Sequence, residues 1–203
     1  MILKLYPDNP NPRYVKMIID CLNDGGLIVC PTDTIYALGG GIRNPKTLER
    51  IAQIKGIKKE KANFSFIFND LSMLSEFTKP IGNDVFKMMK RNLPGAFTFI
   101  LEANNNIPKI FQSKKKTIGI RIPDQPIITN IVKEYGAPLM TTSVWDEDDD
   151  LSSMTDPEEI YERFKDRVDI VLDGGIGGDK GSTVVDCTDN EIVVVREGAG
   201  ELV

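Results

Sequence analysis

Four side chains that could bind or activate a small polar molecule crowd into five consecutive residues: Thr32, Asp33, Thr34 and Tyr36. They follow an apolar run, residues 27–30, and Pro31, which cannot donate a hydrogen bond within a sheet. Hydroxyls and a carboxylate at the end of a buried strand indicate a binding loop, because rigid scaffolds often position functional loops in this way. The same residues also suit a plain turn in which Asp33 or Thr34 bonds its own backbone, followed by a loop over glycines 39–41 that needs positive φ.

Cationic side chains stand at three further positions where they could meet an anion. Lys55 stands beside a glycine at the predicted end of a helix, although cations are also routine there because they complement the helix dipole. Thr117 and Arg121 alternate with isoleucines around Gly119, so both should share one open sheet face. From that face Arg121 could make two parallel hydrogen bonds to a carboxylate or phosphate, or it could form a surface salt bridge instead. Arg196 ends a strand and is a second phosphate-binding candidate.

A glycine-rich segment, residues 174–181, leads into Ser182 and Thr183. It is not a phosphate-binding P-loop, because the Gly-Lys-Ser order and the following helix are missing. The two hydroxyls at its end remain candidates for substrate binding.

The bulk composition narrows the chemistry further. The 203 residues are 41% hydrophobic with a net charge of −5, which suits a single globular domain, residues 1–203, and not a uniformly basic nucleic-acid binder. Lysines nevertheless cluster between residues 55 and 61 and at 114–116. Three scattered cysteines argue against disulfides and a zinc site, and the absence of histidine excludes histidine-based catalysis. Without a signal peptide or membrane-spanning run, we expect a cytoplasmic location.

The elements that must position these residues alternate along the chain. Apolar spacing predicts helices over residues 12–23, 45–54, 71–76, 83–91 and 125–135, and one that starts at 156–159. Short apolar runs predict strands over residues 27–30, 64–68, 96–101, 117–122, 139–142, 168–172, 183–186 and 192–196. The pattern indicates an α/β protein, and because the last strands follow one another through short turns, we expect part of the sheet to be antiparallel.

Together, these segments resemble the YrdC family of threonylcarbamoyl-adenylate synthases, which are also described as double-stranded RNA-binding proteins. The matching segments span nearly the whole chain and are 31–38, 55–56, 94–98, 117–123, 142–143, 182–186 and 196–198. The resemblance implies a twisted, mixed parallel and antiparallel sheet with flanking helices and a large, concave, positively charged cavity.

The resemblance also implies an activity: joining L-threonine, bicarbonate and ATP into threonylcarbamoyl-AMP with release of pyrophosphate, in a tRNA modification pathway. Thr34, Tyr36, Arg121, Ser182 and Thr183 would then bind the amino acid, and Lys55 would be catalytic. The residues that would hold the nucleotide are Asn63, Thr117, Thr141, Ser143 and Arg196. Mg²⁺ would accompany the phosphates of ATP, with no metal site of the protein's own and no membrane partner.

Several positions depart from the family pattern and are typical of its YciO subgroup. Ile57 replaces an arginine expected two residues after the lysine, Phe68 stands near an expected histidine, and Trp145 replaces an asparagine. Five acidic residues, 146–150, replace a glycine-bearing loop. Losing an arginine contact to phosphate removes roughly 1.5–3 kcal/mol of charge-assisted bonding.

These departures keep two further hypotheses open. The chain could be a non-catalytic protein that grips double-stranded RNA or tRNA through its lysine clusters, with an affinity that falls steeply with salt. It could also be a synthase that acts on another small amine, which the sequence does not name.

Overall fold

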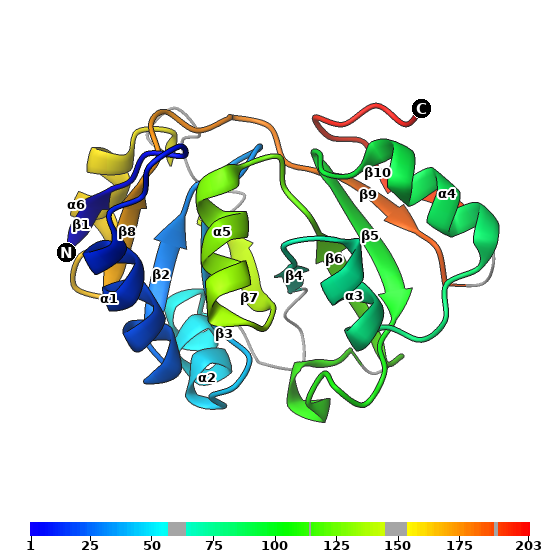
Figure 1. Ribbon diagram of the computed structural model, residues 1–203, viewed down its shortest axis with the longest axis horizontal. Coiled ribbons are helices and arrows are strands. Elements are labelled where there is room, and N and C mark those ends of the chain that lie inside the picture. Colours follow the sequence, from blue (N-terminus) through cyan, green and yellow to red (C-terminus); the bar gives the residue numbers. More distant parts are fainter. Residues whose placement is uncertain (57–63, 114, 145–153, 189–190) are drawn as a thin grey trace.

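The computed structural model describes residues 1–56, 64–113, 115–144, 154–188 and 191–203. One sheet of ten described strands runs through them in the order β1-β8-β2-β3-β7-β4-β6-β5-β9-β10 (Figure 1). The strands are β1 (Ile2–Lys4), β2 (Leu27–Cys30), β3 (Ala37–Gly41), β4 (Ser65–Ile67), β5 (Phe97–Glu102), β6 (Thr117–Arg121), β7 (Leu139–Ser143), β8 (Ile170–Asp173), β9 (Thr183–Asp186) and β10 (Val193–Arg196).

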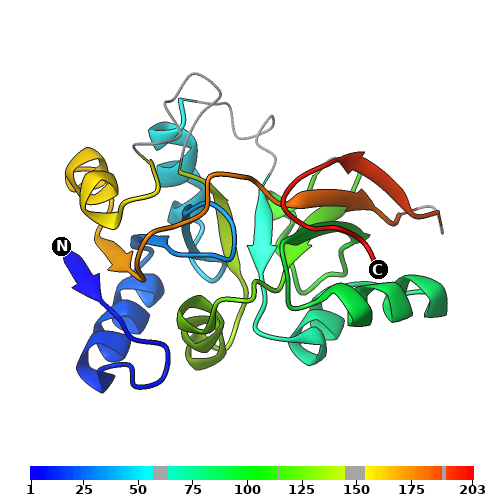
Figure 2. The same cartoon turned by 90° about the horizontal axis from the view of Figure 1, so that it is seen from above.

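The sheet is mixed, as the sequence predicts. β8 is parallel to β1 and β2, β4 is parallel to β6, and β5 is parallel to β9, while the other neighbouring strands are antiparallel. The sheet twists so strongly that β4 is seen almost end-on in Figure 1 and lengthwise in Figure 2. This twist curls one face of the sheet into a concave surface.

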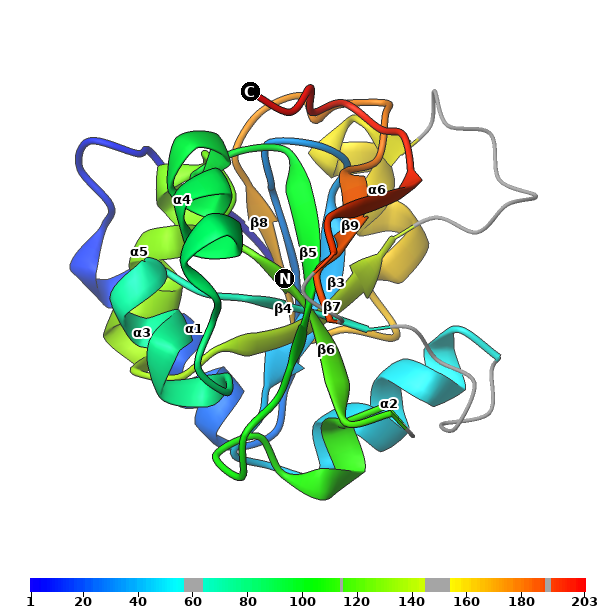
Figure 3. The same cartoon turned by 90° about the vertical axis from the view of Figure 1, so that its right-hand side faces the viewer.

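Helices cover the two faces unequally. The helices are α1 (Pro12–Asn23), α2 (Lys46–Ile54), α3 (Leu71–Phe77), α4 (Asn83–Asn92), α5 (Pro126–Tyr135) and α6 (Pro157–Phe164), with a short 3₁₀ turn η2 (Lys109–Phe111). Figure 3 shows α1, α3, α4 and α5 on one side of the sheet and α2 and α6 on the other. The second side therefore keeps part of the sheet uncovered. None of the described helices is both long and apolar enough to cross a membrane.

Local signals in the sequence set the helix starts. The Asp70 carboxylate accepts a hydrogen bond from the Met73 amide at 2.8 Å, and Asp156 does the same for Glu158 at 2.8 Å. Each cap satisfies an amide that has no partner within the helix. At the other end of a helix, α5 stops at Gly136, whose φ of 71° lies in the left-handed region that glycine tolerates.

Glycines 39–41 are not a loop with positive φ, which corrects one of the two interpretations of this segment. They form the second half of β3, which is fully buried and pairs with β2 and β7. A Cβ atom on Gly39 would lie 2.6 Å from the Met140 carbonyl oxygen, and one on Gly40 would lie 2.7 Å from the Thr47 methyl group. The glycines are therefore required by close packing against β7 and α2, and not by backbone conformation.

The expected run of consecutive late strands is also only partly right. β8 lies between β1 and β2, near one edge of the sheet. The chain then crosses to the opposite edge, where it forms the antiparallel pair β9–β10. The crossing segment, residues 174–182, is called the strap here, and Figure 1 shows it in orange across the top. β1 is a further strand that the sequence patterns do not reveal.

We predict that Gly39→Ala destabilises the fold, because the new methyl group would press on the backbone of β7. Overpacking of this kind costs about 1–3 kcal/mol, measured as the free energy of unfolding in urea. Gly181→Ala is the matched control, because its nearest contact would be 3.7 Å away at the Arg196 side chain. Equal stability of the two variants would contradict the packing explanation for β3.

Candidate functional site

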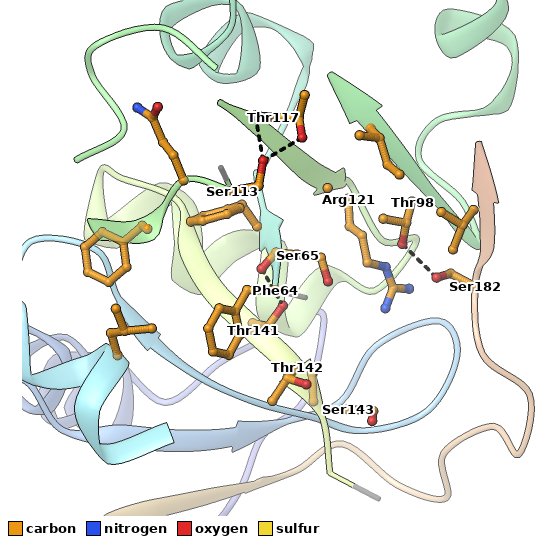
Figure 4. A pocket seen from close by; sticks show the side chains of 18 of the residues that line it. Phe64, Ser65, Thr98, Ser113, Thr117, Arg121, Thr141, Thr142, Ser143 and Ser182 are labelled. Carbon is orange, nitrogen blue, oxygen red and sulfur yellow. Dashed lines mark hydrogen bonds between the residues drawn. The ribbon is translucent and has the colours of Figure 1, made fainter. Parts of the chain in front are cut away.

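A cavity of about 1470 Å³ opens on the concave face of the sheet. Its walls come from the neighbouring strands β3, β7, β4, β6, β5, β9 and β10, and from α2 and the segment around η2. Figure 4 shows hydroxyl side chains and one guanidinium group gathered around its centre. A volume of this size exceeds that of ordinary small-ligand pockets, so the cavity has room for more than one small molecule.

The charge lining this cavity is predominantly positive. Five cationic side chains line it, against two acidic ones, among the residues that the structure describes. The cations are Lys55, Lys109, Lys115, Arg121 and Arg196, and the acids are Glu49 and Asp186. An anionic ligand is favoured there, because walls of one sign concentrate the field inside a concave surface.

Arg121 is the most deeply buried of these cations. Its Nη2 donates to Asp33 Oδ1 at 2.7 Å and to Thr34 Oγ1 at 2.9 Å. The side chains of Arg121 and Asp33 are only 7% and 9% exposed, so this is a buried ion pair and not the surface salt bridge considered from the sequence. Burial lowers the pKa of the Arg121 guanidinium, and the Asp33 carboxylate opposes that shift.

Lys55 and Ser143 lie together in another part of the cavity wall. Lys55 is the C-cap residue that follows α2, and its Nζ donates to the Ser143 carbonyl oxygen at 3.2 Å. Both residues line the cavity. The lysine therefore belongs to the wall of the cavity as well as to the helix C-terminus.

Ser182 and Arg196 meet at the end of the strap. Ser182 Oγ shares a hydrogen bond of 2.7 Å with Thr98 Oγ1, and the Ser182 carbonyl oxygen accepts one from Arg196 Nη2 at 2.9 Å. All three residues line the cavity (Figure 4 labels Thr98 and Ser182). Arg196 also lies near enough to Arg121 to lower the pKa of that guanidinium.

Thr117 and Thr141 line the floor of the cavity. Thr117 and Arg121 share the face of β6 that Gly119 leaves open, as the alternation in the sequence predicts. Ser113 Oγ bonds Thr117 Oγ1 at 2.8 Å, and Thr141 Oγ1 donates to the Ser65 carbonyl oxygen at 3.2 Å (Figure 4). These hydroxyls come from β7, from β6 and from the loop before β6, and the acceptor carbonyl of Ser65 belongs to β4, which lies between the two strands.

Three candidate hydroxyls are already engaged with the protein itself. Thr34 is 1% exposed and bonds Arg121 and Thr32. The Tyr36 hydroxyl donates to the Gly175 carbonyl oxygen at 2.7 Å and so holds the strap, and burial raises its pKa to about 12. Thr183 Oγ1 donates to the Gly200 carbonyl oxygen at 2.6 Å, outside the cavity lining. Tyr36 lines the cavity, whereas Thr34 and Thr183 lie outside its lining.

The remaining positions singled out in the sequence divide into two groups. One group lies outside the described residues and consists of Asn63, Ile57, Trp145, residues 146–150 and the lysines between 58 and 61. Phe68 is described, is fully buried and packs its ring 5.8 Å from that of Phe77, in the core and not in the cavity wall.

Sequence reasoning missed one residue of the cavity wall and one contact behind it. Lys109, in η2, lines the wall beside Lys115, in a region with no recognisable motif. Asp33 stands out in the sequence as a polar group of the loop, but nothing in the sequence reveals it as the partner of Arg121. No group of three or more potential metal ligands gathers within the described ranges.

Comparisons with known proteins identify relatives of the whole chain. A family model named Sua5_yciO_yrdC and described as "Telomere recombination" matches residues 20–198. YciO of Escherichia coli K12, described as uncharacterized, is 39% identical over 98% of this chain and 95% of its own. Its crystal structure superimposes with a TM-score of 0.90, at 38% identity, over 99% of this chain and 97% of that one.

Relatives with a named activity follow. A putative threonylcarbamoyl-AMP synthase of Methanocaldococcus jannaschii is 31% identical over 97% of this chain and 92% of its own. The crystal structure of P. abyssi Sua5 complexed with L-threonine matches with a TM-score of 0.87 at 22% identity, over 98% of this chain and 57% of that one. At that identity the second match supports the fold alone.

We predict that Cys30, at the start of the binding loop, is chemically inert. It is fully buried, and burial raises the pKa of its thiol from 9.0 to about 12. At pH 8.5 its thiolate fraction should be lower by about two to three orders of magnitude than that of an unfolded cysteine. Ellman's reagent measures this on a variant with Cys21→Ser and Cys187→Ser, in buffer and in urea.

The same shift links stability to pH. Because the unfolded thiol ionises near 9.0 and the folded one does not, the free energy of unfolding should fall as pH rises above about 9. Rapid labelling of Cys30 in the native variant at pH 8.5 would contradict the predicted inertness of this thiol, from which the dependence of stability on pH also follows.

Proposed function

The chain belongs to the Sua5/YciO/YrdC family, and from that premise we propose that it is an ATP-dependent synthase of the threonylcarbamoyl-AMP type. In this reaction the amine of L-threonine and bicarbonate form a carbamate and water. A carbamate oxygen then attacks the α-phosphate of ATP, and pyrophosphate leaves. The observation that carries the proposal is one large cavity in which Lys55, Arg121 and Arg196 face the same space.

Both substrates of the proposed reaction are anionic where they must be held. The carbamate and the triphosphate repel each other in water, so catalysis depends on cations that bring them together and on alignment for in-line attack. The hydroxyls of the cavity floor add neutral donors that orient phosphate oxygens. The same cations and hydroxyls can also bind the carboxylate of an amino-acid substrate.

We assign the amino acid to the end of the cavity at Arg121 and Ser182. Thr34, Tyr36 and Thr183 support this end, because they hold Arg121, the strap and the segment after β10. The M. jannaschii relative, named a putative threonylcarbamoyl-AMP synthase, supports the reaction, and L-threonine is the ligand of the P. abyssi structure that shares this fold.

We assign ATP with Mg²⁺ to Lys55, Thr117, Thr141 and Ser143, together with Arg196, which would reach the phosphates from its place beside Ser182. Lys55 is the proposed catalytic cation, because a compact ammonium can follow charge as it develops on the phosphate. Asn63 completes this assignment from outside the described residues. Mg²⁺ enters with the phosphates as part of the substrate.

The purified protein should release pyrophosphate from ATP in the presence of L-threonine, bicarbonate and Mg²⁺. Lys55→Ala and Arg196→Ala should each lower kcat/KM by about tenfold to 150-fold, because a charge-assisted contact contributes roughly 1.5–3 kcal/mol. A coupled pyrophosphate assay measures both.

Lys165→Ala is the matched control, because this exposed lysine pairs with Glu162 on α6 and does not line the cavity. An absence of threonine-dependent pyrophosphate release, with a competent synthase run in parallel, would refute the proposed reaction.

A second candidate is a non-catalytic RNA-binding role. The observation that favours it is the exposed pair Lys109 and Lys115 at the cavity wall, next to Lys116. Lysines on an exposed rim neutralise phosphates without reading sequence.

If this role holds, affinity for duplex RNA should fall steeply between 50 and 200 mM salt, and Lys109→Ala with Lys115→Ala should flatten that dependence by about two phosphate contacts. Fluorescence anisotropy with a labelled duplex measures the slope. Binding that is absent, or insensitive to salt, would eliminate this candidate.

A further inference from the structure

The ion pair between Asp33 and Arg121 leaves the arginine with an unusual set of unused donors. Nη2 gives one hydrogen to Asp33 Oδ1 at 2.7 Å and the other to Thr34 Oγ1 at 2.9 Å. Nε is buried and has no hydrogen-bond partner among the described residues. A guanidinium can bind a carboxylate through either of two bidentate edges. One edge is Nη1 with Nη2 and the other is Nε with Nη2, so both require Nη2. Neither edge is therefore available to a ligand.

The carboxylate that imposes this arrangement is itself fixed at both oxygens. Asp33 Oδ2 accepts the Asp124 amide at 3.0 Å, just after β6, while Oδ1 holds Arg121 at the end of β6. Thr34 is fixed in turn, because its hydroxyl bonds that of Thr32 at 3.0 Å and its amide donates to the same Thr32 oxygen at 3.0 Å. The guanidinium therefore has one orientation that these contacts allow.

That orientation directs the guanidinium into the cavity. Figure 4 shows its nitrogen atoms in the open centre, with Thr98 and Ser182 on one side and Ser143 on the other. Asp33 does not line the cavity, so it would not touch a ligand there.

We propose that Asp33 is a positioning residue, which holds Arg121 so that it offers Nη1 as a single-point contact to the carboxylate of the amino-acid substrate. This inference rests on the proposed function. The second carboxylate oxygen then needs another donor. The hydroxyls of Ser182 and Thr98, which share one hydrogen bond, lie beside the guanidinium in Figure 4 and are neutral candidates for it. Asp33 thus acts on the substrate only through Arg121.

The alternative is that Asp33 merely stabilises the fold, and the Asp169–Arg50 pair provides the matched control. Asp169 Oδ2 accepts Arg50 Nη1 at 2.7 Å and the Leu27 amide at 2.7 Å, so it also joins an arginine to a backbone amide. It lies at a separate surface hollow, away from the cavity. Asp169→Asn should therefore lower stability without changing either substrate's KM.

Asp33→Asn keeps the shape of the side chain but turns an amide donor toward either Arg121 or the Asp124 amide. We expect the KM for L-threonine to rise by about tenfold or more while the KM for ATP stays within about twofold. Arg121→Lys should produce a similar rise, and the double variant D33N/R121K should be no worse than R121K alone, because both changes act through one group. An equal rise in both KM values, or additive effects, would overturn the inference.

A second measurement decides the inference independently of catalysis. In ¹⁵N-labelled protein, the Arg121 Nη signals, assigned by their loss in R121K, should be separate and protected from exchange, and D33N should merge them. Titration with L-threonine should shift these signals in the wild type. A freely rotating guanidinium in the wild type would overturn the inference even if pyrophosphate is released. If no threonine-dependent pyrophosphate release occurs, the proposed function fails, and the spectrum and titration still decide whether Asp33 positions Arg121 for a carboxylate.

Discussion

The buried ion pair between Asp33 and Arg121 connects two parts of the sheet that are not neighbours. Asp33 follows β2 and Arg121 ends β6, with β3, β7 and β4 between these strands. Removing one partner from a buried pair costs about 3–5 kcal/mol, because the other charge is left unpaired. The loop therefore has to fold over the concave face whenever β6 is in place.

A second constraint works through atoms that are missing. β3 is central in the sheet, and its glycines allow Met140 of β7 and Thr47 of α2 to approach its backbone from two directions. Thr47 Oγ1 then donates to the Gly41 carbonyl oxygen at 2.9 Å and fixes α2 beside the sheet. Because Lys55 caps the C-terminus of α2, this packing also helps to place its ammonium group next to the Ser143 carbonyl oxygen. The position of this cation thus depends on the absence of a side chain at Gly40.

The sequence predicts most elements because their signals are local. Caps such as Asp70 and Asp156, and the alternation that places Thr117 and Arg121 on one face, depend only on nearby residues. The strand β3 was missed because glycine favours no strand by itself, and only its neighbours across the sheet explain it. The position of β8 was missed for a similar reason, since order along the chain does not determine order across a sheet. The candidate site follows the same division: the residue types were visible, but the partner of Arg121 was not.

The engaged hydroxyls suggest how this cavity keeps a defined shape while holding so much positive charge. Arg121 and Arg196 repel each other, and each is held by a fixed acceptor, Asp33 for one and the Ser182 carbonyl oxygen for the other. Thr34 and Tyr36 in turn fix the loop and the strap that carry these acceptors. Preorganised cations of this kind need little rearrangement when an anion binds, which is the condition under which electrostatic stabilisation is most effective. The binding loop is therefore best understood as holding Arg121 in place through Asp33 and Thr34.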